Sequence, residues 1–190
     1  MSVTEIVGSL PSENAIVAFV DVDKLRAGGY LDLLMSSGAT EESDYRSFVE
    51  ESRFDYKSDL DQLAIAFRDD DRFAVAVGRF DWAQLRKFTE KRGVKCHNGF
   101  CESPATEFGR INSFYSIRTN IMAYGSGKTA GLAHSARAGA SPAHNWPGAP
   151  VWIRVPGSYF NNQRGLPDGT KMFASALSAI SMAVRPTNSH

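Results

Sequence analysis

The sequence has only two cysteines, no net charge, and no apolar run long enough to cross a membrane as a helix. Its longest apolar stretch, residues 172–184, is shorter than the roughly 20 residues that a spanning helix needs. Serines interrupt this stretch on one side, so we expect a buried terminal helix starting near Thr170, no transmembrane segment, and a soluble chain. Residues 1–11 lack the basic and long apolar regions of a signal peptide.

Complete catalytic motifs are also missing. The four histidines show no metal-ligand spacing, and no serine lies in a G-x-S-x-G nucleophile elbow. Residues 124–129, Tyr-Gly-Ser-Gly-Lys-Thr, match the end of a phosphate-binding loop, but Met122 stands where that motif needs its first glycine. We interpret the segment as a strand-to-helix turn in which Ser126 caps a helix, and we expect no cofactor.

What the sequence does contain is a composition typical of one folded domain. It has 190 residues, 43% hydrophobic and 22% charged, and a domain of this size buries roughly 70% of its unfolded surface. Residues 14–97 follow the order β-α-β-β-α-β of the ferredoxin-like split βαβ arrangement. We therefore predict one α+β domain over residues 1–190, with a ferredoxin-like core at about 14–97. An extension at about 100–184 adds a second hairpin, a strand and helices.

The expected elements follow from local patterns. Asp23 is predicted to cap the first helix, and Asp81, with Gln84 as its capping-box partner, is predicted to cap another. Gly93 is expected to end that second helix. The loop 139–150 is the segment most typical of a binding loop. The remaining predicted elements are strands at 14–22, 62–67, 72–77, 112–119, 120–124 and 151–155, and helices at 41–52 and 126–137.

The two cysteines flank an Asn98-Gly99 step, which strongly favours a two-residue hairpin turn. His97 and Phe100 would then form the pair that closes the turn, and Cys96 and Cys101 would lie opposite each other. Their Cα atoms would be about 4.5 Å apart, within disulfide range. We expect a disulfide, which favours an exported protein. Reduced thiols remain an alternative, whereas a metal site would need a second pair of ligands.

Three carboxylates are candidate metal ligands by their positions in the sequence. Asp21 ends the first predicted strand, and Asp70 and Asp71 lie in the next hairpin, an arrangement similar to the nucleotide-cyclase palm. There, acidic residues at these two places hold two metal ions. Arg72, however, stands where the cyclases have an acidic residue. We interpret these side chains as a helix cap and a solvated turn, and keep Asp21, Asp70 and Asp71 as candidate metal ligands only.

The distribution of charge is asymmetric. Residues 1–71 carry 16 acidic and 6 basic side chains, a net charge of −10, and residues 72–190 carry 5 acidic and 15 basic, a net of +10. Either the two parts interleave and their charges mingle, or the surface is dipolar. Basic residues cluster around the Asp81 helix without interleaved stacking aromatics, which argues against a nucleic-acid partner.

Three segments carry a resemblance: 10–15, Leu-Pro-Ser-Glu-Asn-Ala; 54–61, Phe-Asp-Tyr followed by Asp59-Leu60-Asp61; and 78–81, Gly-Arg-Phe-Asp. Together they resemble a loose family of uncharacterised bacterial proteins, many of them exported. The resemblance implies ferredoxin-like α+β halves, and it implies no established activity and no catalytic residues.

We therefore expect a non-catalytic binding or interaction domain, with the cell envelope as a candidate location. An exported protein, periplasmic or extracellular, is favoured over a cytoplasmic one. Its partner would be an unidentified protein or small molecule, and a homo-oligomer is left open. The alternative is a divergent metal-dependent nucleotide-binding enzyme of the cyclase/palm type.

Overall fold

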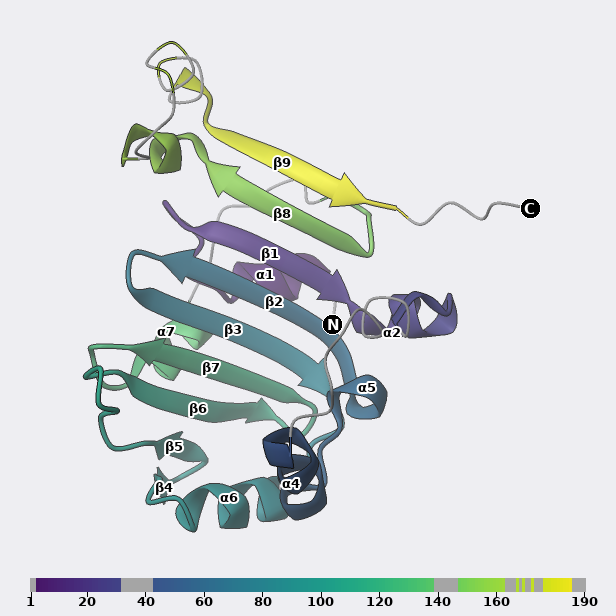
Figure 1. The fold of residues 1–190 in the computed structure, drawn as a ribbon, viewed down its shortest axis with the longest axis vertical. Coiled ribbons are helices and arrows are strands. Elements are labelled where there is room, and N and C mark those ends of the chain that lie inside the picture. The colour runs from purple at the N-terminus through teal and green to yellow at the C-terminus, as the bar shows by residue number, and fades with distance from the viewer. Residues whose placement is uncertain are drawn as a thin grey trace.

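One nine-stranded antiparallel sheet organises the chain (Figure 1), with strand order β4-β5-β6-β7-β3-β2-β1-β8-β9. The computed structural model describes residues 3–31, 43–138, 147–162 and 176–185, together with Pro167, Gly169 and Met172. The strands are β1 Ile16–Asp21, β2 Leu60–Arg68, β3 Asp71–Gly78, β4 Lys95–His97, β5 Phe100–Glu102, β6 Ile111–Arg118, β7 Ile121–Gly127, β8 Val151–Pro156 and β9 Ala179–Val184. The helices are α1 Val3–Gly8, α2 Val22–Ala27, α4 Ser43–Ser52, α5 Tyr56–Asp59, α6 Trp82–Glu90, α7 Leu132–Ala138 and the 3₁₀ helix η1 Gly157–Asn162.

The α+β class is confirmed, but the ferredoxin-like order of residues 14–97 is not. A split βαβ core places parallel strands on either side of an inserted strand. Here β1 instead pairs directly and antiparallel with β2, from Ile16 opposite Phe67 to Asp21 opposite Gln62. β3 continues on the other side of β2, and β4 lies at the distant edge. The helices between β1 and β2 therefore join antiparallel neighbours.

The rear face of the sheet carries the larger core, and we define it by Val17, Ala64, Val75 and Ala123, all fully buried. Helices α1 and α7 lie behind the sheet and cover this face (Figure 1). Trp152 of β8 stacks on Phe19 of β1, with ring centroids 5.8 Å apart.

The front face is lined by the side chains of the alternate residues. The strand registers place one row of apolar side chains across seven strands, because each residue of the row lies opposite the next residue, on the neighbouring strand. In order from β6 to β9 this row is Phe114, Tyr124, Ala74, Ile65, Ala18, Ile153 and Met182. Helices α4 and α6 lie in front of its β6 end (Figure 1). Val22 and Leu25 of α2 join a second buried cluster that includes the front-face residues Val20, Leu63 and Val151. Over the rest of the half formed by β2, β1, β8 and β9, Figure 1 draws no helix of the described residues.

The short-range predictions are largely confirmed. The hairpin of β2 and β3 has the expected turn, with Asp69 at a φ of 53°. Asp81 accepts a hydrogen bond from the Gln84 backbone N–H and caps α6, as predicted. Asp21 rather than Asp23 caps α2, because its carboxylate accepts from the Lys24 backbone N–H. Helix α1, which we did not predict, contributes Ile6 and Val7 to the core.

Two predicted helices are wrong in part. The helix expected from Ser126 begins at Leu132, because residues 121–127 continue β7 instead. The expected terminal helix is contradicted at residues 179–184, which form β9 and pair with β8 from Val151 opposite Val184 to Pro156 opposite Ala179. Most of the loop predicted at 139–150 lies outside the described residues. No helix in the described part of the chain is long and apolar enough to span a membrane.

Candidate functional site

The carboxylates proposed as metal ligands do not come together. Asp21 lies opposite Gln62 at one end of β2, and Asp71 lies opposite Arg68 at the other end. Along β2 these two positions, Gln62 and Arg68, are six residue steps apart, or about 20 Å at the usual rise per residue. A two-metal site needs carboxylates that converge, so this geometry gives the cyclase/palm alternative no support.

Two of these carboxylates, those of Asp21 and Asp70, have structural roles. The buried Asp21 carboxylate caps α2 and lies 3.0 Å from the Lys24 Nζ atom. Asp70 lies 2.9 Å from Lys128 Nζ, and this ammonium group lowers the pKa of the Asp70 carboxyl below its usual value. Among the described residues, no group of three or more His, Cys, Asp or Glu side chains is placed to hold a metal ion.

A polar depression of about 570 Å³ surrounds Asp21 and includes Asp61 and Arg79. Its carboxylates have basic partners, since Arg79 contacts Asp61 at 3.6 Å and Arg26 contacts Asp23 at 3.1 Å. Arg26 also donates to the carbonyl oxygens of Lys57 and Leu60. These contacts join α2 to the start of β2, so the depression is a structural ionic cluster.

The glycines of the phosphate-loop-like segment belong to strand β7. Gly127 pairs with Ile111, so these backbone groups take part in a β-ladder and do not wrap a phosphate. A Cβ atom on Gly125 would lie 2.5 Å from the Ala133 backbone nitrogen. The glycine therefore allows α7 to pack closely on the sheet. Ser126 does not cap a helix; it is buried and its hydroxyl accepts a hydrogen bond from Arg110.

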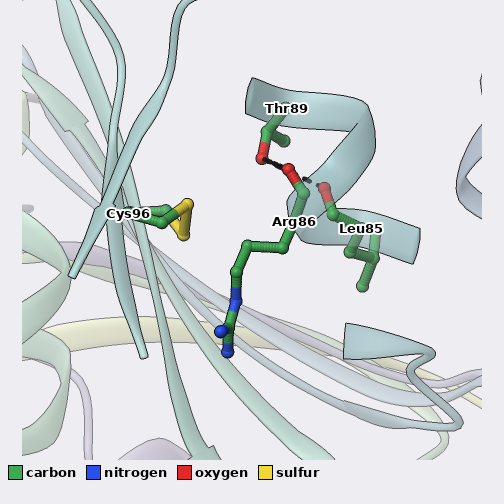
Figure 2. Close-up of a disulfide and its surroundings, with 5 residues drawn as sticks. Leu85, Arg86, Thr89 and Cys96 are labelled. Atoms are coloured by element: carbon green, nitrogen blue, oxygen red, sulfur yellow. Dashed lines mark hydrogen bonds between the residues drawn. A yellow bond between two sulfur atoms is a disulfide. The ribbon is translucent and has the colours of Figure 1, made fainter. Parts of the chain in front are cut away.

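The cysteine hairpin has the predicted register. Asn98 and Gly99 have φ angles of 48° and 81°, His97 pairs with Phe100, and Cys96 pairs with Cys101. The two cysteines form a disulfide, with 4.0 Å between their Cα atoms. Cys101 lies opposite Phe114, so the disulfide hairpin of β4 and β5 pairs with β6 and forms one edge of the sheet, beside α6 (Figure 2).

The two halves of the charge distribution interleave. Glu51 of α4 binds Lys91 at 3.3 Å and Arg92 at 3.2 Å, both just after α6. These hydrogen bonds lower the pKa of the Glu51 carboxyl, the Arg92 contact having the larger effect. The pairs formed by Arg79 and Lys128 likewise join the acidic first part of the chain to the basic second part.

An apolar pocket of about 170 Å³ lies between α4, α6 and the front face of β6 and β7. Aromatic rings form most of its wall: Phe48, Phe54, Phe80, Phe88, Phe114 and Tyr124. Helix α4 is fixed over it by Tyr45, whose hydroxyl donates to Asp55 at 2.7 Å. Burial and this hydrogen bond raise the pKa of Tyr45. The sequence showed the individual aromatics but not that they surround one space.

The part of the front face that the described residues leave exposed, near β9, is a second candidate. Its exposed side chains include Phe67, which is 39% exposed, Met182 at 64% and Val184 at 58%. β9 carries two of these residues and is the last strand of the sheet. The sequence analysis placed Met182 and Val184 inside a buried helix, so this surface was missed.

Comparison with known proteins gives distant structural likeness only. No protein-family model and no curated protein matches the chain. Two solved structures, crystal forms III and IV of a protein named TP0453, each share 10% sequence identity and a TM-score of 0.49 with the chain. They cover 85% of this chain, and the matched part is 68% and 69% of theirs.

Proposed function

We propose that this protein is a non-catalytic interaction domain that assembles with a second copy of itself through strand β9. The observation that carries the proposal is the combination of an apolar edge strand with neighbouring apolar side chains that the described residues leave exposed. The second copy would add its own β9, antiparallel, to the edge of the sheet.

The two edges of the sheet differ in how they are protected. An exposed edge strand offers unpaired N–H and C=O groups to another strand, and proteins usually protect it by shortness, charge or proline. β4 has three residues and includes Lys95. β9 has six residues, Ala-Ile-Ser-Met-Ala-Val, with no charge and no proline. A long, uncharged apolar edge is the kind that pairs with another chain.

The edge is also complementary to itself. A twofold axis perpendicular to the sheet keeps the front faces of both copies on one side. If Met182 lies opposite its own copy, Ile180 lies opposite Val184, and all three side chains face the front. Ile180, Met182 and Val184 are 39%, 64% and 58% exposed, so pairing would shelter apolar surface as well as satisfy backbone groups. The zero net charge adds no overall repulsion between copies.

An oxidising compartment such as the cell envelope suits this domain. The Cys96–Cys101 disulfide supports export, because such bonds persist outside the reducing cytosol. Membership of the loose family of exported bacterial proteins is part of the same proposal. The ferredoxin-like halves of that family are not needed for it.

Sedimentation equilibrium over a wide concentration range tests the assembly. The wild-type chain should show a reversible monomer–dimer equilibrium, and Met182→Lys should weaken dimerisation at least tenfold because it places two ammonium groups side by side. Phe108→Lys is the matched control, since Phe108 is 77% exposed and lies outside β9. It should dimerise like the wild type. A monomeric wild type, or equal weakening by both variants, would exclude β9 as the interface.

A further inference from the structure

The aromatic pocket beneath α4 and α6 has the properties of a ligand site that is independent of β9. Protein interiors are packed nearly as densely as organic crystals and leave few voids larger than a water molecule. A space of about 170 Å³ between two helices and a sheet is much larger than that.

The polar groups at this pocket are already engaged by the protein. The Thr89 hydroxyl lies 3.0 Å from both the Leu85 and the Arg86 carbonyl oxygens, so its proton is directed at the helix backbone (Figure 2). The Tyr124 hydroxyl donates to Asn112 Oδ1 at 2.9 Å. Neither hydroxyl has a proton left for an occupant. An anionic occupant would therefore find no hydrogen-bond donor here, and a buried charge without a partner is strongly unfavourable.

The arrangement of the rings favours an aromatic occupant. Phe48 meets Phe54 at an interplanar angle of 77° and Phe88 at 82°, while Phe54 and Phe80 stack at 18°. The wall thus offers both ring faces and ring edges, the two surfaces on which aromatic molecules pack. An apolar cavity of about 150 Å³ is large enough for benzene, so this pocket of about 170 Å³ is large enough for a compact aromatic compound.

We propose that this pocket binds a small uncharged aromatic compound, a single ring or a fused pair as small as indole. The disulfide and the Glu51 ion pairs hold the surrounding elements in place, so the site is formed before the ligand arrives. We expect the pocket wall to select ligands by their shape and by their lack of charge.

Indole and p-xylene are suitable probes, with benzoate as a charged control of similar size. Thermal unfolding of the wild type should shift upward and saturably with indole or p-xylene, because a ligand that binds only the folded state stabilises it. Benzoate should produce no shift. The absence of a saturable shift with both uncharged probes would overturn the proposal.

Two filling variants test the location. Met122→Phe and Thr89→Leu add side-chain volume at the pocket wall, and each should reduce the indole-induced shift several-fold while retaining a cooperative unfolding transition. Ile65→Phe adds a ring to the same sheet face outside the pocket and should leave the shift unchanged. Met182→Lys should also leave it unchanged. An undiminished shift in whichever filling variant remains folded would place the binding elsewhere and contradict the assignment.

Discussion

Phe48 of α4 and Phe88 of α6 meet edge to face, with 5.1 Å between ring centroids. One turn further along α4, Glu51 binds both Lys91 and Arg92, and the Arg92 guanidinium lies 3.7 Å from the Phe88 ring centroid. Helix α4 is thus held against α6 by aromatic and ionic contacts that share residues. This pair of helices forms the outer wall of the aromatic pocket.

Removing the Phe88 ring should loosen this wall. Phe88→Ala is expected to lower the free energy of unfolding by about 1–3 kcal/mol, less than for a fully buried phenylalanine because Phe88 is only partly buried. Phe88→Leu should cost less than half as much. Urea unfolding followed by circular dichroism measures both. A loss below about 0.5 kcal/mol for Phe88→Ala would mean that the ring does not hold α4 in place.

Acid should weaken the same contact. The pKa of Glu51 is lowered in the folded state, so its ionised form stabilises the fold above the unfolded pKa near 4.5, and this contribution is lost as pH falls through the lower folded pKa. Asp70 behaves in the same way through Lys128. The urea concentration at the unfolding midpoint, measured at low salt, should decrease as the pH drops below about 4.5, and this decrease should be smaller in Glu51→Gln. An identical pH profile in this variant would contradict the role of Glu51.

The disulfide should stabilise the hairpin that carries it. Loop-entropy arguments give about 2 kcal/mol for closing so short a loop. Reduction, or replacement of Cys96 and Cys101 by serine, should therefore lower the urea midpoint. Mass spectrometry of protein from an oxidising compartment should find no free thiol before reduction. Two free thiols there would contradict the disulfide.

Gly125 should tolerate no side chain. A Cβ at this position would lie 2.6 Å from the Leu132 carbonyl carbon, so Gly125→Ala must push α7 from the sheet and cost about 1–3 kcal/mol. Gly148→Ala is the control, because a methyl group there would meet no atom of the described residues within 4 Å, and it should be neutral. Equal stability of the two variants would show that α7 does not pack closely at Gly125.

Features with local causes were predictable from the sequence. Asn98 and Gly99 alone determine a turn that places Cys96 opposite Cys101, and Asp81 caps α6 through a neighbour three residues away. The strand patterns of β1, β2 and β3 are similarly local. For these elements the physical cause lies within a few residues.

Features that depend on distant partners were not predictable. The run Ala179–Val184 is short and mostly apolar, and it continues the apolar stretch that begins at residue 172, so its pattern alone does not distinguish a helix from a strand. The segment is a strand because it pairs with β8. The pairing of β1 with β2, like the meeting of Phe88 with Phe114 at one pocket, follows from the tertiary arrangement.

Hydrogen exchange of the β9 backbone tests the proposed assembly most directly. In a dimer paired through β9, the amides of residues 179–184 that point away from β8 become hydrogen-bonded, so their exchange should slow as protein concentration rises from low micromolar to several hundred micromolar. Met182→Lys should keep them fast at every concentration. Concentration-independent exchange of these amides in the wild type, at concentrations where sedimentation shows a dimer, would contradict pairing through β9.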